Sequence, residues 1–323
     1  MNSEIKNDIV YIEQLKKKIN ELKKKRNAVI IVHNYQREEV QDIADISGDS
    51  LELSKAAIRT DADAIVFCGV NFMAETASIL NPKRVVLLPV KEAGCPLADM
   101  VTVEKLKNYR QQYPDAAVAC YVNSSARVKA ESDICCTSSN AIEVVRSLKE
   151  EKIIFIPDRN LGRYVQAQVP EKQIILWKGF CPTHIRVQED DIVEMKKVHP
   201  GAEVVVHPEC SPQVTILADH ICSTGGMFKY VKVSNSKKFI IGTEIGMLYR
   251  LKKENPDKEF FVATENLLCP SMKLITLGWI AHSLEYMVYE VKVPEDIRIK
   301  ALRSLQKMLE VSGGPHMSAV VGY

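Results

Sequence analysis

The apolar residues of this chain fall into short runs, and three of these runs end in a similar polar cluster. They are AVIIVHNYQ from residue 28, AAVACYVNSS from residue 116 and AEVVVHPEC from residue 202. Aligned on His33, Tyr121 and His207, the runs stand 88 and 86 residues apart. A fixed spacing of this kind indicates an internal repeat, here three copies of one unit.

Three further kinds of residue follow the same spacing. A hydroxyl stands seventeen residues after each anchor, at Ser50, Ser138 and Thr224. An apolar side chain stands forty residues after each anchor, at Met73, Leu161 and Met247. About sixty residues after each anchor comes a Cys-Pro pair, with its cysteine at Cys95, Cys181 or Cys269. Because the chain has only 14 prolines among its 323 residues, composition does not explain three Cys-Pro pairs in register.

Within each copy, the pattern predicts the order strand, helix, strand, helix, strand, cysteine loop and helix. The strands are continuously apolar, as in a parallel sheet covered on both faces, and the segments between them show a 3.6-residue period. We therefore expect an α/β fold of three αβα units with short parallel sheets. A pseudo-threefold axis should relate them and carry the active site. The predicted boundaries are 1–108, 109–195 and 196–311, with a tail at 312–323.

The terminal segments are assigned to this repeat pattern. The run IEQLKKKINELKKK from residue 12 stands where helices precede the second and third copies. We therefore assign it to the first unit rather than to a dimeric coiled coil. Two more helices are expected near the C-terminus, and the residues after them show no pattern.

Composition and charge narrow the class of protein. A net charge of +2 does not indicate a nucleic-acid or membrane partner. The N-terminus lacks the apolar core of a signal peptide, and no apolar run reaches the roughly 18 residues of a membrane span. A cytoplasmic location is expected. The nine cysteines then favour metal binding or catalysis over disulfides.

The strand ends are the expected site, because ligands bind beyond the carboxyl ends of parallel strands. Each first strand ends in two polar residues at i and i+2, which point to one face. These residues are His33 and Tyr35, Tyr121 and Asn123, and His207 and Glu209. The helix-start hydroxyls can cap their helices, or they can help bind an anion carrying carboxylates or phosphate.

The three Cys-Pro cysteines would meet on the common axis. Three thiolates do not complete a structural zinc site. They suit a [4Fe–4S] cluster with one iron left open as a Lewis acid. His184, three residues after Cys181, is a possible fourth ligand, but a substrate contact is the preferred interpretation.

Several segments together resemble the quinolinate synthase family. They are, in order, HNYQ, EVQDIADISGDSLELS, GVNFMAETASILNP, YVNSSA, CTSSNAIEVV, PDRNLG, VVHPEC, STGGM and GTEIGM. The resemblance runs from about residue 15 to 310 and implies a transferase of NAD biosynthesis with a pseudo-threefold α/β fold. It implies condensation of iminoaspartate (iminosuccinate) with dihydroxyacetone phosphate, giving quinolinate, phosphate and two waters. An L-aspartate oxidase or dehydrogenase would supply the iminoaspartate.

The resemblance also implies roles for individual residues. It places a [4Fe–4S] cluster on Cys95, Cys181 and Cys269. It gives substrate contacts to His33, Ser50, Tyr121, Asn123, Ser138, His207, Glu209 and Thr224. Tyr35 and His184 match positions with catalytic roles.

Our first choice for general acid/base is Glu209, with His207, His33 and Tyr35 assisting proton transfers. Tyr121 is assigned to the open iron or to proton donation.

Three other functions stay open from the sequence. An iron–sulfur hydro-lyase of the aconitase type shares the open-iron logic but does not need to bind phosphate. An iron–sulfur redox sensor predicts a DNA-binding element or basic patch, and the sequence shows neither. A zinc-binding structural protein is distinguished by its metal content.

Overall fold

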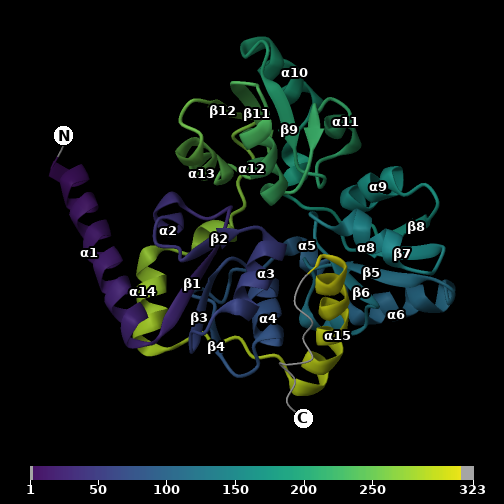
Figure 1. Cartoon of the computed structure of the whole chain (residues 1–323), viewed down its shortest axis with the longest axis horizontal. Helices are drawn as coiled ribbons and strands as arrows, with labels where there is room; N and C mark the ends of the chain where they lie inside the picture. The colour runs from purple at the N-terminus through teal and green to yellow at the C-terminus, as the bar shows by residue number, and fades with distance from the viewer. Residues whose placement is uncertain (1–2, 314–323) are drawn as a thin grey trace. The chain divides into compact units, whose positions relative to one another are not determined.

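The computed structural model describes residues 3–313, and the side chains of residues 10–313. Three four-stranded sheets form, one in each copy, with strand orders β2-β1-β3-β4, β6-β5-β7-β8 and β10-β9-β11-β12 (Figure 1). Every neighbouring pair is parallel. The predicted α/β fold of short parallel sheets flanked by helices is confirmed.

The elements follow one another in the same order in each copy. The first copy contains α1 (Ser3–Lys25), β1 (Ala28–His33), α2 (Glu38–Gln41), β2 (Ile46–Gly48), α3 (Ser50–Arg59), β3 (Ala64–Cys68), α4 (Asn71–Leu80), β4 (Val85–Leu87) and α5 (Pro96–Asp99). The second contains α6 (Val103–Gln112), β5 (Ala117–Tyr121), α7 (Ala126–Ala130), β6 (Ile134–Cys136), α8 (Ala141–Ser147), β7 (Lys152–Ile156), α9 (Arg159–Gln168), β8 (Gln173–Leu176) and η1 (His184–Arg186). The third contains α10 (Glu189–Val198), β9 (Glu203–Val206), α11 (Pro212–Thr215), β10 (His220–Ile221), α12 (Thr224–Val233), β11 (Lys238–Gly242), α13 (Met247–Glu254), β12 (Glu259–Val262), η2 (Met272–Leu274) and α14 (Leu277–Tyr286). The last helix is α15 (Glu295–Val311).

Each copy holds one short helix and one short strand that the hydrophobic pattern did not predict. The strands are β2, β6 and β10, each of two or three residues at the edge of its sheet. A run this short has no measurable periodicity, so the chain's pattern shows only the other three strands of each sheet. The central strands are buried as expected: all five residues of β3 and all five of β5 are buried.

The edge strands are held by an aspartate that recurs with the repeat spacing. Asp45, Asp133 and Asp219 precede β2, β6 and β10. Each carboxylate accepts a hydrogen bond from a backbone N–H of the neighbouring first strand, at 2.8, 2.7 and 2.8 Å. Each also forms an ion pair with a Lys or Arg of the first helix of its copy (α1, α6 or α10), at 2.6, 2.5 and 3.6 Å. Because the cation facing Asp45 is Lys23 of α1, the N-terminal helix occupies the place that α6 and α10 hold in the other copies.

Replacing Asp133 by Ala is expected to lower the free energy of unfolding by about 1–3 kcal/mol, because the Val118 N–H loses its acceptor. Urea denaturation followed by circular dichroism measures the loss. Asp115→Ala is the matched control. Asp115 forms an exposed pair with Lys152 at 2.7 Å, so its loss should lower the free energy of unfolding far less. Equal losses in both variants would contradict a special role for the recurring aspartate.

A second recurring contact fixes the start of each cysteine loop. The third residue after the end of the strand (β3, β7 or β11) donates its backbone N–H to the carbonyl two positions before the cysteine. The pairs are Asn71 to Ala93 at 2.8 Å, Arg159 to Gly179 at 2.9 Å and Ile245 to Leu267 at 2.8 Å. The three cysteines are therefore anchored in the same way within their own copies.

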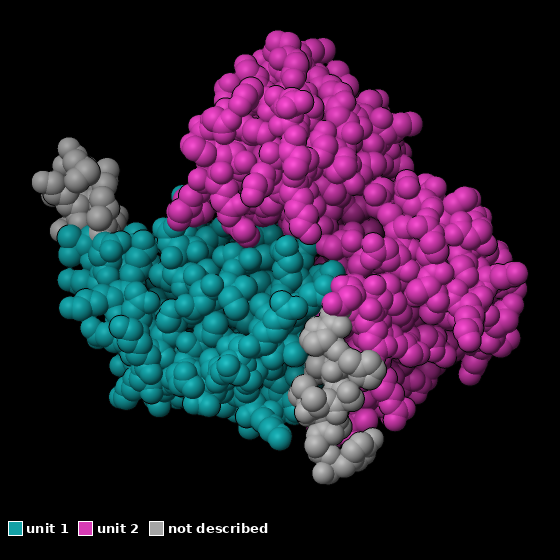
Figure 2. Space-filling model, in the orientation of Figure 1, with its two compact units in different colours: residues 1–94, 269–293 teal, residues 95–268, 294–323 magenta. Residues whose placement is uncertain are grey.

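The chain divides into two compact units (Figure 2). One comprises the residues up to 94 together with 269–293, and the other comprises 95–268 and the residues from 294. Helices α1 and α14 pack together in the first unit, and α15 packs on α7 and β6 in the second. The predicted repeat boundaries stay a prediction. Of the predicted tail, residues 314–323 lie outside the described part.

Within residues 3–313, the structure contains no helix both long and apolar enough to span a membrane.

Candidate functional site

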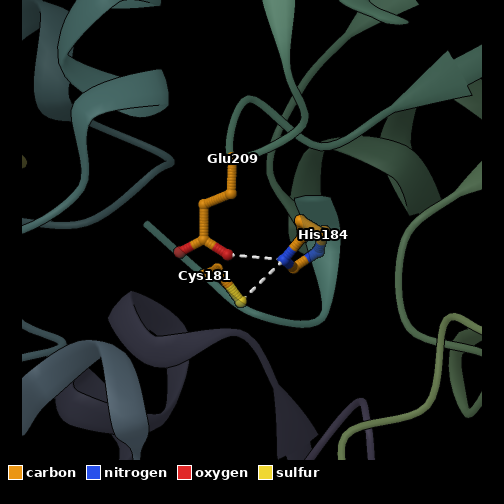
Figure 3. Close-up of side chains that lie close together, drawn as sticks. All are labelled: Cys181, His184 and Glu209. Atoms are coloured by element: carbon orange, nitrogen blue, oxygen red, sulfur yellow. Dashed lines mark hydrogen bonds and ion pairs between the residues drawn. The ribbon is translucent and has the colours of Figure 1, made fainter. Parts of the chain in front are cut away.

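The second unit brings together side chains from three strand ends and one cysteine loop. Glu209 follows β9, and its Oε2 lies 2.7 Å from Nδ1 of His184 (Figure 3). The same Nδ1 lies 3.2 Å from Sγ of Cys181. On the other edge of the ring, Nε2 lies 2.9 Å from Oγ1 of Thr243, which follows β11. With a proton on Nδ1, His184 donates to Glu209 and accepts from the Thr243 hydroxyl.

His207 lies beside this group and has a defined tautomer. Its ring stacks on that of His184 at 4.7 Å between centroids. Its Nδ1 accepts the backbone N–H of Glu209 at 3.3 Å, and its Nε2 lies 3.1 Å from Oγ of Ser138. Because Nδ1 accepts, the proton of the neutral ring is on Nε2, where it can be donated to an oxygen.

The first unit repeats this arrangement at the end of β1. The backbone N–H of Tyr35 donates to Nδ1 of His33 at 3.2 Å, and the two rings meet edge to face at 4.6 Å. Lys273, four residues after Cys269, donates to the Tyr35 carbonyl at 2.6 Å. The loop after the third cysteine is thus tied to the His33–Tyr35 strand end.

Burial and neighbouring charges shift the pKa values of the buried carboxyls of Glu209 and Asp158 in opposite directions. Burial raises the pKa of Glu209, but its interactions with His184 and His207 outweigh burial and lower the pKa to about 2. Burial and the charge of Glu209 raise the pKa of Asp158 well above its ordinary value. The carboxyl of Glu209 is therefore held in its ionised form beside the two imidazoles.

The helix-start hydroxyls do not cap their helices through their own side chains. Asp49 caps α3 and Ser223 caps α12, while Ser50 and Thr224 are the first helical residues. Ser138 lies two residues before the N-cap of α8. Because the neighbouring residues Asp49 and Ser223 cap these helices, helix capping does not explain the hydroxyls of Ser50 and Thr224. A hydrogen bond of 2.8 Å between Ser139 and Ser223 brings the starts of α8 and α12 together.

The three Cys-Pro cysteines differ from most of the others in exposure. Cys95, Cys181 and Cys269 are partly exposed, as is Cys222, whereas the remaining five are buried. All nine lie in the described part of the chain, and none forms a disulfide. The negative charge of a Cys95 thiolate contributes to raising the pKa of Cys181, after burial and Glu209, so these two cysteines of the second unit are electrostatic neighbours.

The donor set of the second unit suits a metal group. The ligand atoms of Cys181, His184 and Glu209 all lie within 4.8 Å of one another. Two acceptor atoms, Oε1 of Glu209 and Oδ1 of Asn123, are buried without a hydrogen-bond partner among the described residues. Buried polar atoms are nearly always satisfied, so these two indicate a place for a ligand.

Two polar residues of the site were missed in the sequence. Asp158 and Thr243 are fully buried at the ends of β7 and β11. Both follow the second apolar run of their copies: Asp158 lies three residues before Leu161, and Thr243 lies four residues before Met247. A polar residue directly after a buried strand was the available signal.

The second unit therefore has the features of an α/β enzyme, with a buried acid–base group and soft metal ligands at its strand ends. Comparison with known proteins agrees. The family model described as Quinolinate synthetase A protein matches residues 17–310.

Curated relatives match along nearly their whole length. A quinolinate synthase of Thermodesulfovibrio yellowstonii is 57% identical over 288 residues, covering 89% of this chain and 95% of the relative. The quinolinate synthase of Geobacter sp. strain M21 is 57% identical, covering 93% and 98%. That of Dehalococcoides mccartyi strain CBDB1 is 52% identical, covering 94% and 100%. The chain belongs to the quinolinate synthase family.

Proposed function

We propose that this enzyme condenses iminoaspartate with dihydroxyacetone phosphate, releasing phosphate and two waters to form quinolinate. The observation that carries the proposal is the ionised, buried Glu209 paired with His184 beside Cys181. The condensation and ring closure need several proton transfers at carbon, nitrogen and oxygen. A buried base with a neighbouring imidazole supplies them.

We further propose that Cys95, Cys181 and Cys269 hold a [4Fe–4S] cluster. Thiolates are the usual ligands of such clusters, and the three loops start from equivalent backbone contacts. When bound, the cluster would supply a Lewis acid for a substrate hydroxyl or carboxylate. Metal binding would also displace the proton that burial holds on Cys181, whose pKa is raised.

The remaining residues would orient and protonate the substrates. Ser50, Ser138 and Thr224 stand at helix starts, where hydroxyl and N–H groups suit carboxylate or phosphate oxygens. Tyr121 and Asn123 would donate to substrate oxygens. His207 would donate its Nε2 proton, with His33 and Tyr35 in equivalent roles at the other strand end.

An anaerobic assay tests this function. The purified protein, reconstituted with iron and sulfide, is mixed with dihydroxyacetone phosphate and with iminoaspartate generated by an L-aspartate oxidase that is supplied with an electron acceptor other than oxygen. We expect quinolinate and phosphate to form in equal amounts, and product formation to stop after iron is chelated. An aconitase-type hydro-lyase would leave dihydroxyacetone phosphate unconsumed. Zinc in place of iron in the active protein would contradict the cluster.

A further inference from the structure

A single buried carboxylate, that of Asp158, holds the second cysteine loop from two sides. Its Oδ2 accepts the backbone N–H of Cys181 at 2.9 Å. Its Oδ1 accepts the N–H groups of Asn160 and Leu161 at 2.9 and 2.8 Å, which caps α9. The side chain is completely inaccessible to solvent.

The backbone around Asp158 reinforces this contact. Asp158 and Gly179 form a parallel β-bridge, and Arg159 donates to the Gly179 carbonyl. A Cβ on Gly179 would lie 2.3 Å from the Pro157 carbonyl oxygen, so only glycine permits this approach. The Cys181 loop therefore packs directly against Asp158, whose carboxylate accepts the N–H of Cys181.

The first copy cannot make this contact, because Val70 occupies the matching position and has no side-chain acceptor. Glu244 occupies it in the third copy, where its Oε2 accepts the N–H of Gly246, two residues further along the same turn, at 2.7 Å. A carboxylate at this position is therefore not required to form the sheet and cysteine loop of a copy.

The same capped turn reaches the catalytic carboxylate. Asn160, whose N–H is fixed by Asp158, donates its side-chain amide to the backbone carbonyl of Glu209 at 3.0 Å. Asn160 is itself buried. A continuous set of hydrogen bonds therefore joins the Cys181 N–H, the Asp158 carboxylate, Asn160 and the main chain of Glu209.

We propose that Asp158 is a positioning residue that holds the Cys181 loop and the Glu209 loop in one fixed arrangement. Cys181 and Glu209 both meet Nδ1 of His184, so the distance between the two loops determines whether the imidazole contacts both. The meaning of this arrangement for a cluster rests on the proposed function. The arrangement itself does not, because every hydrogen bond in it joins two groups of this chain.

Asp158→Asn tests the proposal. The Asn amide has only one acceptor oxygen, so it can accept either the N–H groups that cap α9 or the N–H of Cys181. Its NH₂ group would face whichever of these N–H donors the oxygen does not bind. In the metal-free variant we expect iodoacetamide to alkylate Cys181 at least about tenfold faster than in the parent, because the loop opens more often. Mass spectrometry of the peptide carrying Cys181 measures the rate, with the partly exposed Cys222 as internal reference. In the iron-loaded variant, a chelator should remove iron faster.

Asp49→Asn is the matched control, because Asp49 caps α3 through two N–H bonds of 3.0 and 2.9 Å. It should leave Cys181 alkylation unchanged. Equal alkylation in the parent and Asp158→Asn, or an equal rise in Asp49→Asn, would overturn the proposal.

If Asp158→Asn does not fold, hydrogen exchange in the parent decides. We expect the Cys181 amide to be protected, and exchange as fast as in an open loop would overturn the assignment. Absence of iron from the reconstituted parent would instead refute the cluster, leaving the metal-free measurement valid.

Discussion

Replacing Glu209 by Gln is expected to lower kcat by about 10²- to 10⁴-fold while leaving the iron content unchanged. Gln has nearly the same shape but cannot accept a proton at neutral pH. His184 would lose the carboxylate that its Nδ1 meets at 2.7 Å. Since the cysteine thiolates are untouched, the expected result is a loaded enzyme that does not turn over.

Steady-state kinetics with iron and sulfide analysis checks this expectation. Glu203→Gln is the control, because Glu203 begins the same strand, β9, and bonds to Tyr230 and Ser234 instead of the site. It should retain kcat within a few-fold. Full activity in Glu209→Gln would remove Glu209 from its catalytic role, whereas loss of iron would make it a metal ligand.

Replacing Cys95 by Ala is expected to abolish both the cluster and quinolinate formation. A cluster held by three protein thiolates has no spare ligand, so loss of one leaves two irons without protein donors. We expect the anaerobically reconstituted variant to lose the visible absorption of the cluster and to show activity below detection.

Cys222→Ala provides the control for this change. Cys222 is partly exposed like Cys95, but it precedes Ser223 instead of a proline and lies outside the three cysteine loops. Its removal should leave iron content and activity intact. A Cys95→Ala protein that is active without iron would rule out the proposed mechanism.

Much of the fold was predictable because the central strands are buried on both faces. Continuous apolar runs such as residues 64–68 and 117–121 give a strong local signal. The short edge strands β2, β6 and β10 gave no such signal. Strand β10 has two residues, His220 and Ile221, and both are partly exposed. It exists because Asp219 bonds to Val204 on the neighbouring strand, a contact set by the tertiary structure.

The candidate site was predictable where its residues recur in register. Cys181, His207 and Glu209 follow from spacing and strand-end position. The contact of His184 with Glu209 did not, since the two are 25 residues apart in sequence. Asp158 and Thr243 were missed because their partners, the Cys181 N–H and the His184 ring, come from other segments. Polar contacts of this kind leave no periodic trace in a single sequence.

The bonds that start the three cysteine loops run from one backbone group to another, with no side chain taking part. The donor of such a bond can be any residue except proline, and Asn71, Arg159 and Ile245 all serve. The bonds that fix the frame are thus separate from the side chains that form the site. The copies can therefore differ in their strand-end side chains while keeping the same frame. Three like parts could then specialise into His33 with Tyr35, Tyr121 with Asn123, and His207 with Glu209. A substrate without threefold symmetry requires different side chains at the three strand ends.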